Sequence, residues 1–388
     1  VQYDQAVYER IVAAYREFAQ SLGLTDVRAI LEDAKATPPT QEEIDREYAQ
    51  LDTALAIQVE NADTEASAKQ ASDIAGAVDI RETTVSPQAA LDIFRSGKPG
   101  MTPEFMLDAT RRLLTSGVVR ALLLLPQAQP GAQEKLAAAL KAPVAAAKDV
   151  RLSAKMATID DLPKLGSPAT VVKREQIGLN GMEIVTFSNG VKLTLFANDA
   201  ETEKVRIAVR WGHGQQDFSP TKAEPMWAAN YALVASGIGD LGQQQLDDIT
   251  NGRRLGFDFS IDDNAFEFAA VTRPADYKDQ LKLFATKLMA PRWDDAPVER
   301  LKAGLIAASN TAEQSADGVL GRDLGYLLHA GDVRFRTPDK GEIMALTPDA
   351  FRKTWEPRMA EGPIEVQIFG QVNPDDAIAA VAEIGRAH

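Results

Sequence analysis

The tripeptide Ser188-Asn189-Gly190 is the feature that most constrains the fold, because two alternating segments flank it. The segments are MEIVTF, residues 182–187, and VKLTLF, residues 191–196. Asn-Gly between alternating apolar and polar residues is a strong short-range signal for a β-hairpin, and we expect positive φ at both turn positions. The sequence therefore predicts an antiparallel hairpin over 182–196.

The residues after this hairpin predict an α+β module. Apolar and charged side chains alternate over 204–211, which is typical of a strand, and a second hairpin is expected at 257–261 and 266–271. A closing strand is expected at 364–369. Helices are predicted over 221–236, 241–251, 276–289, 295–313, 318–329, 348–360 and 375–384. Hairpins combined with runs of helices indicate an α+β fold, with an antiparallel-rich sheet and helices packed mainly on one face.

The N-terminal part, residues 1–140, is predicted to be mostly helical. Apolar residues recur at helical spacing over 8–15, and a largely apolar run predicts a buried strand at 118–125. Residues 141–171 contain Ala, Lys and Pro without a sustained period and are predicted to be a linker. The alternative is an ordered loop packed on a neighbouring element. Further helices are predicted over 39–60, 87–94, 103–114 and 133–140.

Two segments of the chain repeat one pattern. MTPEFMLDATRRLLTSGVVRALLLL begins at Met101, LTPDAFRKTWEPRMAEGPIEVQIFG begins at Leu346, and the two align without a gap. Both have Thr-Pro and a carboxylate at a predicted helix start, followed by a Gly and a buried strand. The repeat predicts two related modules, of which the first lacks its N-terminal half in this chain.

Charge and residue types exclude several kinds of site. The formal net charge of -14 over 388 residues argues against non-specific binding to nucleic acid. No apolar run is long enough to span a bilayer. There is no Cys, so disulfides and thiolate metal sites are excluded, and the three His residues are His213, His329 and His388. Metal ligands are therefore scarce from the outset.

The order of the predicted elements from residue 172 onward resembles the M16 (pitrilysin/insulinase) family of zinc peptidases, which includes the mitochondrial processing peptidase. The matching pieces are EIVTFSNGVKLTLF, VRIAVRWGHGQQD with the following helix, FDFSIDDNAFEFAAV and IEVQIFGQVNPDDAIAAV. The resemblance implies tandem M16-type modules. Residues 1–140 would be the C-terminal part of a preceding module, 141–171 the linker and 172–388 a complete module. Because the chain begins at Val1 directly in a helical pattern, we expect it to be part of a longer protein.

Active members of that family carry H-x-x-E-H on the helix after the strand, where two His bind zinc and the Glu acts on zinc-bound water. The equivalent positions in this chain are Trp227, Asn230 and Tyr231. None of them is a sound zinc ligand. The resemblance therefore implies a module without catalytic residues or metal, with zinc in a missing N-terminal module. Trp227, Tyr231 and Val234 share one face of the predicted helix, and we expect them to pack in the core rather than line a substrate chamber.

The His residues are predicted to have ordinary structural roles. His213 lies between two Gly and is expected on an exposed loop, with Asp217 and Glu224 as the only nearby residues able to complete a metal site. His329 ends a predicted helix, where an imidazole favours the negative end of the helix dipole. His388 is terminal and indicates nothing.

The resemblance implies a non-catalytic part of a peptidase, which encloses and positions peptide or unfolded protein substrates together with the missing N-terminal module. An alternative is a non-catalytic scaffold or assembly subunit built on the same fold. A third interpretation is an unrelated α+β binding module. An H-x-x-E-H motif upstream of Val1 in the parent protein separates the first two. The compartment stays open, since the bacterial periplasm and the cytoplasm are both compatible with the sequence.

Overall fold

The computed structural model describes residues 24–115, 122, 130–146, 156–178 and 181–384. The chain forms two compact units: Val1–Lys155 with Asn251–Arg253, and Met156–Thr250 with Arg254–His388. The helix predicted around residues 8–15 lies outside the described residues, and so does the strand predicted at 118–125, apart from residue 122. None of the described helices is both long and apolar enough to cross a bilayer.

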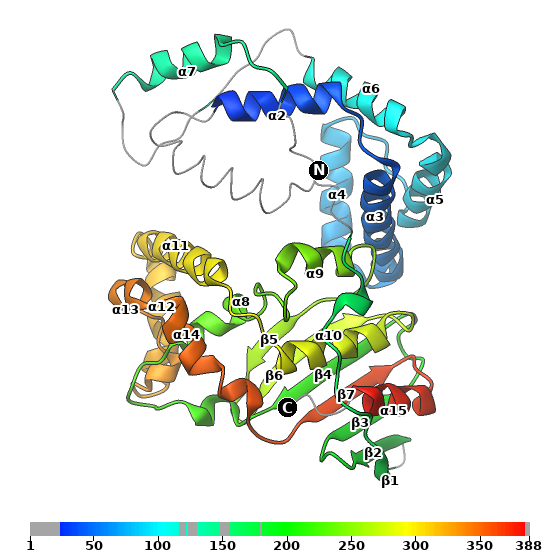
Figure 1. Ribbon diagram of the computed structural model, residues 1–388, viewed down its shortest axis with the longest axis vertical. Helices are drawn as coiled ribbons and strands as arrows, with labels where there is room; N and C mark the ends of the chain where they lie inside the picture. Colours follow the sequence, from blue (N-terminus) through cyan, green and yellow to red (C-terminus); the bar gives the residue numbers. More distant parts are fainter. Residues whose placement is uncertain (1–23, 116–121, 123–129, 147–155, 179–180, 385–388) are drawn as a thin grey trace. The chain divides into compact units, whose positions relative to one another are not determined.

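The described part of the first unit is helical (Figure 1). Four predicted helices are present, and two further helices, α2 and α4, were not predicted. Tyr48 of α3 stacks on Phe94 of α5 with ring centroids 4.6 Å apart, and Arg95 pairs with Asp52 at 2.7 Å. The helices are α2 (Leu24–Ala36), α3 (Gln41–Asn61), α4 (Ser67–Asp79), α5 (Pro87–Gly97), α6 (Pro103–Leu114) and α7 (Ala132–Lys141).

The second unit is built on one mixed sheet, which has seven strands within the described residues. Their order is β1-β2-β3-β7-β4-β6-β5, and every neighbouring pair is antiparallel except β3 and β7. Both predicted hairpins and both other predicted strands are present, whereas β1 was not predicted. The strands are β1 (Val171–Ile177), β2 (Met182–Phe187), β3 (Lys192–Ala197), β4 (Val205–Trp211), β5 (Asp258–Ile261), β6 (Phe266–Thr272) and β7 (Glu365–Gly370).

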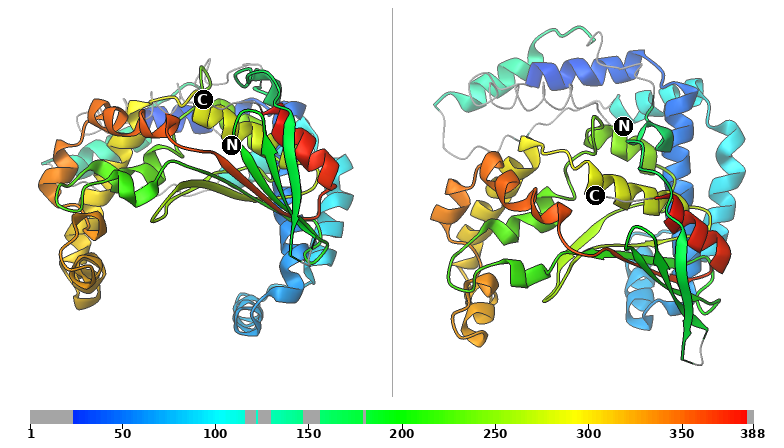
Figure 2. Two further views of the ribbon diagram at one scale, coloured as in Figure 1. Left: turned by 90° about the horizontal axis from the view of Figure 1, so that it is seen from below. Right: turned by 60° about the horizontal axis from the view of Figure 1, so that its bottom comes forward.

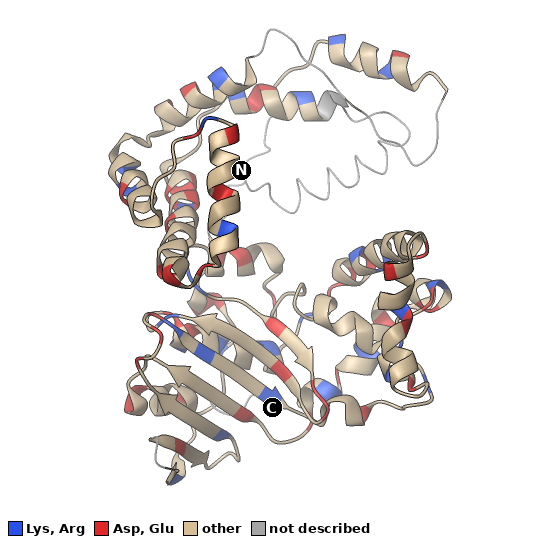
Figure 3. Cartoon of the chain, turned by 180° about the vertical axis from the view of Figure 1, so that it is seen from behind, with Lys and Arg blue, Asp and Glu red and all other residues tan. Residues whose placement is uncertain are grey.

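The two faces of the sheet differ. Along β4 the side chains of Val205, Ile207, Val209 and Trp211 are buried, as the alternation of the sequence predicts. The helices α10 (Tyr277–Met289) and α15 (Pro374–Glu383) lie on this face, whereas no described helix of the unit covers the opposite face (Figures 1 and 3). The α+β fold and the one-sided packing of helices are therefore confirmed.

A group of helices lies on the β5 side of the sheet, with α8 next to β5 and α11 next to α8 (Figures 1 and 2). Its aromatic core joins the sheet through Trp355, whose ring lies 5.6 Å from Phe259 and 5.3 Å from Phe266. The short helix α13 was not predicted. The helices are α8 (Ala229–Ala232), α11 (Asp295–Ala312), α12 (Ala316–Leu328), α13 (Lys340–Ala345) and α14 (Pro348–Trp355), with α9 (Gln243–Thr250) elsewhere in the unit.

The first hairpin turn differs from the expected one. Gly190 has a φ of 88°, but Asn189 is not among the described non-Gly residues with positive φ. The Gly190 amide donates to the Phe187 carbonyl at 3.0 Å, and the Phe187 amide donates to Val191 at 2.9 Å. Three residues, not two, therefore connect the strands, and a three-residue loop needs the left-handed conformation only at its last position.

The repeated Thr-Pro pattern gives the same helix start twice. The Thr102 side chain accepts from the Phe105 amide at the start of α6, and the Thr347 side chain accepts from Ala350 at the start of α14. Pro occupies the first turn of both helices. This part of the repeat is present in the structure, while the equivalence of the two strands stays a prediction.

Residues 156–170, at the end of the predicted linker, pack within the sheet unit. Leu162 is buried beside Ile238 and Leu283, and the Ala169 amide donates to the Ala382 carbonyl at 2.9 Å. Residues 156–170 therefore form an ordered segment packed on its neighbours, which is the alternative interpretation of these residues.

Candidate functional site

The segment after β4 holds the positions where a zinc helix is expected, but it is not the predicted helix over 221–236. It consists of a 3-10 turn, η5 (Pro225–Ala228), the single-turn helix α8 and a turn. Glu224 is extended, with φ -127° and ψ 156°. Pro225 disfavours helical backbone at the residue before it, and the extended Glu224 separates residues 221–223 from the helical turn that follows. The prediction of a long helix was wrong for this reason.

The three positions equivalent to the family's zinc motif lie at the margin of the core. Trp227 is partly buried and packs against the main core, Asn230 is exposed, and Tyr231 is 42% exposed. The Tyr231 hydroxyl lies 3.4 Å from Arg300 Nε, which donates to it. The side chains that this segment buries fully are Ala228, Ala229, Ala232 and Leu233. The prediction that these side chains pack in the core is therefore confirmed in part for Trp227 and wrong for Tyr231.

These side chains do not fit a zinc ion. The Trp227 indole can only donate a hydrogen bond, and Asn230 has no basic group that could take a proton from water. A zinc site on a helix needs two ligands one turn apart, and Trp227 and Tyr231 occupy those positions here. No metal-dependent step can be assigned to this segment.

A buried amine holds the C-terminal end of the same segment. Lys287 of α10 is fully buried, and its Nζ donates to the carbonyls of Ser236 at 2.5 Å and Gly237 at 3.1 Å. Burial lowers the pKa of Lys287 to about 7, and the nearby Asp294 carboxylate opposes this shift. These two backbone carbonyls hold the buried amine, so Lys287 ties the turn after α8 to α10.

The turn directly after β4 contains the other candidate residues. Trp211 ends the strand with 1% exposure, and its Nε1 donates to the Arg358 carbonyl at 3.0 Å. Gly212 and Gly214 both have positive φ, at 64° and 62°. A Cβ on Gly214 would lie 2.1 Å from the Asp262 carbonyl oxygen, so only Gly fits there. The Gly-His-Gly sequence thus fixes a tight turn with His213 at its tip.

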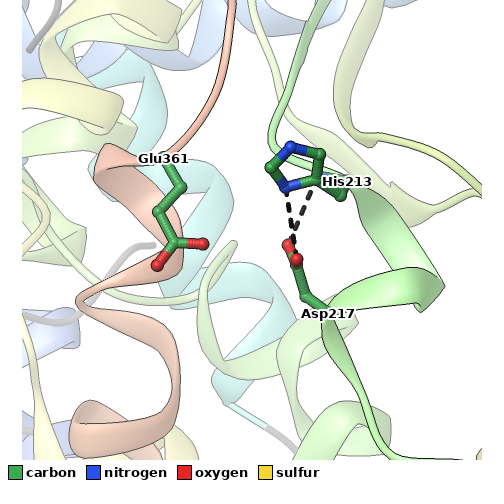
Figure 4. Close-up of side chains that lie close together, drawn as sticks. All are labelled: His213, Asp217 and Glu361. Atoms are coloured by element: carbon green, nitrogen blue, oxygen red, sulfur yellow. Dashed lines mark hydrogen bonds and ion pairs between the residues drawn. The ribbon is translucent and has the colours of Figure 1, made fainter.

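Three potential metal ligands meet at this turn (Figure 4). His213 Nδ1 lies 3.2 Å from Asp217 Oδ1, and the His213 amide donates to Asp217 Oδ2 at 3.3 Å. Glu361 comes from the segment before β7, and one ligand atom of each residue lies within 4.8 Å of the others. The side chain of His213 is 56% exposed and that of Asp217 17% exposed. One imidazole and two carboxylates therefore lie close together.

Arg358 fixes the two segments to each other. Its Nη2 donates to the Asp217 carbonyl at 2.8 Å, and its guanidinium lies 4.3 Å from the centre of the Phe218 ring. The Gly212 amide also donates to the Glu361 carbonyl at 3.1 Å. The pairing of β4 with β7 brings these segments together, since Arg210 pairs with Glu365 in the sheet. The cluster therefore rests on a sheet end rather than on a free loop.

The sequence identified two of the three cluster residues. His213 and Asp217 were predicted neighbours, but Glu224 lies 3.8 Å from Arg358 Nη2 and is not in the cluster. Glu361 was missed, because its proximity arises from strand pairing far along the chain. The only usable signal was the predicted strand at 364–369, whose first residues must lie at one end of the sheet.

His329 has the predicted structural role. It follows the last residue of α12, its Nδ1 lies 2.7 Å from the Gly325 carbonyl, and its ring stacks on Phe335 with centroids 3.5 Å apart. It therefore caps the helix end. His388 lies outside the described residues.

The uncovered face of the sheet is the other candidate surface (Figure 3). Strand pairing aligns Thr194, Gln367, Ala208 and Ala269 in one row across its centre. All four are partly exposed, and the two Ala leave space above the middle strands. A charged row and a row that contains two Phe, one Arg and one Val border this small-residue row. They are Lys192, Glu365, Arg210 and Glu267 on one side, and Phe196, Phe369, Arg206 and Val271 on the other.

No protein-family model matches the chain, and no curated protein matches it. The periplasmic protease PqqL from Escherichia coli matches 93% of the chain with a TM-score of 0.52 at 16% identity. A mutant of the ferredoxin protease FusC, solved with Arabidopsis ferredoxin, also matches 93%, with a TM-score of 0.53 at 15% identity. An inactive M16 peptidase domain from Pseudomonas fluorescens matches 54% of the chain, and 51% of that domain, with a TM-score of 0.45 at 16% identity.

The comparisons show a shared fold. The chain has an M16-like fold, as the order of its strands and helices in the sequence implied. It spans 40% of the length of PqqL and 40% of the length of FusC. Fold likeness does not assign activity, so activity has to be argued from the residues of the chain itself.

Proposed function

We propose that this chain, with its M16-like fold, is a non-catalytic part of a zinc metallopeptidase that helps to enclose and position peptide or unfolded protein substrates. Hydrolysis would take place at a zinc site in an N-terminal module of the same parent protein. The role of this chain would be positioning the substrate and excluding water, not bond chemistry.

One observation carries the proposal. At the segment where active M16 peptidases are expected to bind zinc, this chain has Trp227, Asn230 and Tyr231 on an M16-like fold. The segment is nevertheless well fixed, since Leu233 is buried and Lys287 donates to the Ser236 carbonyl in the turn that follows α8. A segment with a fixed backbone and no zinc ligands is what we expect in a non-catalytic module of a peptidase.

The uncovered face of the sheet supports the substrate-enclosing role. Its centre has small side chains at Ala208 and Ala269, bordered by a charged row on one side and by the row with Phe196 and Phe369 on the other. Such a surface offers hydrogen bonds, charge and apolar contact to an extended peptide without strict sequence preference. A face covered by no described helix of its unit is the natural wall of a chamber.

The test of this role is peptide binding by the purified chain and by variants of the small-residue row. Ala208→Lys places a long cation over the centre of the face, and we expect affinity for an unstructured peptide to fall at least about tenfold. Ala303→Lys on exposed α11 is the matched control and should leave affinity unchanged. Equal peptide affinity of the parent chain, Ala208→Lys and Ala303→Lys, with unchanged melting temperatures, would contradict the proposal.

Measurements on the full-length parent protein distinguish the peptidase from the scaffold alternative. A peptidase requires chelator-sensitive hydrolysis by the full-length parent, together with bound zinc that is absent from a variant of its N-terminal module. A parent protein without such activity, and without the motif H-x-x-E-H, would support the scaffold.

A further inference from the structure

We propose that His213, Asp217 and Glu361 form a binding site for one divalent transition-metal cation of the zinc type. This inference goes beyond the proposed function and does not rest on it. The site lies on the turn after β4 and on the segment before β7, not on the segment that holds Trp227, Asn230 and Tyr231.

The distances suit a small cation after minor adjustment. One ligand atom from each residue lies within 4.8 Å of the other two. Ligand atoms around a tetrahedral zinc ion lie roughly 3.3 Å apart, since zinc–nitrogen and zinc–oxygen bonds are about 2.0–2.2 Å. His213 and Asp217 already meet at 3.2 Å. The exposed Glu361 side chain has to move by only a rotamer adjustment to close the set.

The charges favour a cation. Two carboxylates converge on one imidazole, and within the described residues Glu361 forms no ion pair. The Arg358 guanidinium, which comes from the same segment as Glu361, donates to the Asp217 carbonyl and lies 3.8 Å from the Glu224 carboxylate. A divalent ion would therefore neutralise charge that no described Lys or Arg neutralises at Glu361.

The backbone around the cluster is prepared for binding. The Gly212 amide bonds to the Glu361 carbonyl, and the Trp211 indole bonds to the Arg358 carbonyl, so the two segments are joined without an ion. Binding would order only the tips of the side chains. Preorganisation of this kind preserves affinity that would otherwise be lost to ordering.

The ligand set selects the class of ion. An imidazole with two carboxylates suits zinc, cobalt or manganese, whereas calcium and magnesium prefer oxygen ligands alone. Three protein ligands leave further coordination positions, and the 56% exposure of His213 leaves them open to water. The ion would add a further link between the exit of β4 and the segment before β7, which backbone hydrogen bonds already join.

The experiment is equilibrium dialysis of the purified, tag-free chain against zinc, with metal counted by mass spectrometry. We expect one zinc per chain, and cobalt should give the visible absorption bands of a low-symmetry site. His213→Ala and Glu361→Gln should each weaken zinc binding at least about tenfold. Zinc should raise the melting temperature of the parent chain but not of these variants, because only a native-state ligand stabilises by mass action.

Two matched controls make the result specific. His329→Ala removes the other described imidazole, and Glu224→Gln removes a carboxylate beside Arg358 but outside the cluster. Both should bind zinc like the parent, and Asp217→Asn, which keeps the side-chain shape, should bind weakly. Zinc binding that survives Glu361→Gln, that disappears with His329→Ala, that calcium matches in affinity, or that is absent from the parent chain would each overturn the proposal.

Discussion

The turn at 212–217 and the segment at 225–232 follow the same strand, β4, yet they differ in whether they carry side chains that could bind a metal ion. The segment occupies the position where the M16 resemblance puts zinc ligands, and its side chains cannot bind zinc. The turn lies at no expected metal position, and it brings one imidazole close to two carboxylates. Similarity to a fold therefore does not predict where metal-binding side chains lie close together. Their positions depend on which backbone segments are neighbours in this chain.

The physical difference lies in what fixes each region. Small buried side chains and the buried Lys287 amine anchor the 225–236 backbone, so its polar side chains are free to differ. Positive-φ glycines and hydrogen bonds to the segment before β7 anchor the turn, so its side chains are held in place. The following predictions test this contrast, beginning with the largest expected effect.

Truncating Leu233, a buried side chain that anchors the 225–236 backbone, should have the largest effect. Leu233 is 1% exposed, so Leu233→Ala should lower the free energy of unfolding by about 2–5 kcal/mol through lost burial and a cavity. Tyr231→Ala on the same segment should change it by less than about 1 kcal/mol, because the ring is 42% exposed. Chemical denaturation measures both, and similar losses would show that the segment is not anchored as described.

Adding one methyl group to the turn should be the next largest effect. Gly214→Ala puts a Cβ on the Asp262 carbonyl oxygen in a left-handed conformation, so we expect a loss of at least about 2 kcal/mol. Gly304→Ala is the control, since α11 leaves space there and the change should stabilise by up to about 1 kcal/mol. A harmless Gly214→Ala would mean that the turn is not rigid.

The buried amine predicts a pH dependence with a definite sign. The pKa of Lys287 is lowered from 10.5 to about 7 in the folded chain, so between these values the unfolded chain binds more protons. The free energy of unfolding should therefore rise from pH 7 towards pH 10, by at most about 1.4 kcal/mol per pH unit. Below pH 7 both states are protonated and the contribution is flat.

Lys287→Met tests whether Lys287 causes this pH dependence, because the substitution roughly keeps the length of the side chain and removes the titrating group. Urea denaturation at several pH values should show a smaller slope above pH 7 in the variant than in the parent chain. An unchanged slope would assign the pH dependence to other groups.

The sequence predicted the elements whose signals are local. The alternation over 204–211 and the two hairpins produced the correct strands, since pattern and turn residues lie within a few positions. The strand β1 was missed because all seven of its residues are exposed, which leaves no alternation to detect. The helix over 221–236 was overextended because apolar spacing was weighed above Pro225.

The candidate site was predicted only in part for a related reason. His213 and Asp217 lie four positions apart and could be paired from the sequence alone. Glu361 joins them through the β4–β7 pairing and the close approach of Gly362 to Gly212, where a Cβ on Gly362 would lie 2.9 Å from the Gly212 backbone. Such contacts depend on the strand order, which no local pattern specifies.

The most direct test of the central claim is to incubate the purified chain with a mixed set of unstructured peptides and to follow every peptide by mass spectrometry. The account predicts that peptides bind but stay intact for hours, with or without added zinc. Trp227, Asn230 and Tyr231 hold no metal at the position of the family's zinc motif, and Asp217 and Glu361 would be ligands of an ion bound at the turn and could not act as its base. Peptide cleavage that zinc restores and a chelator abolishes, in a sample free of other peptidases, would contradict it.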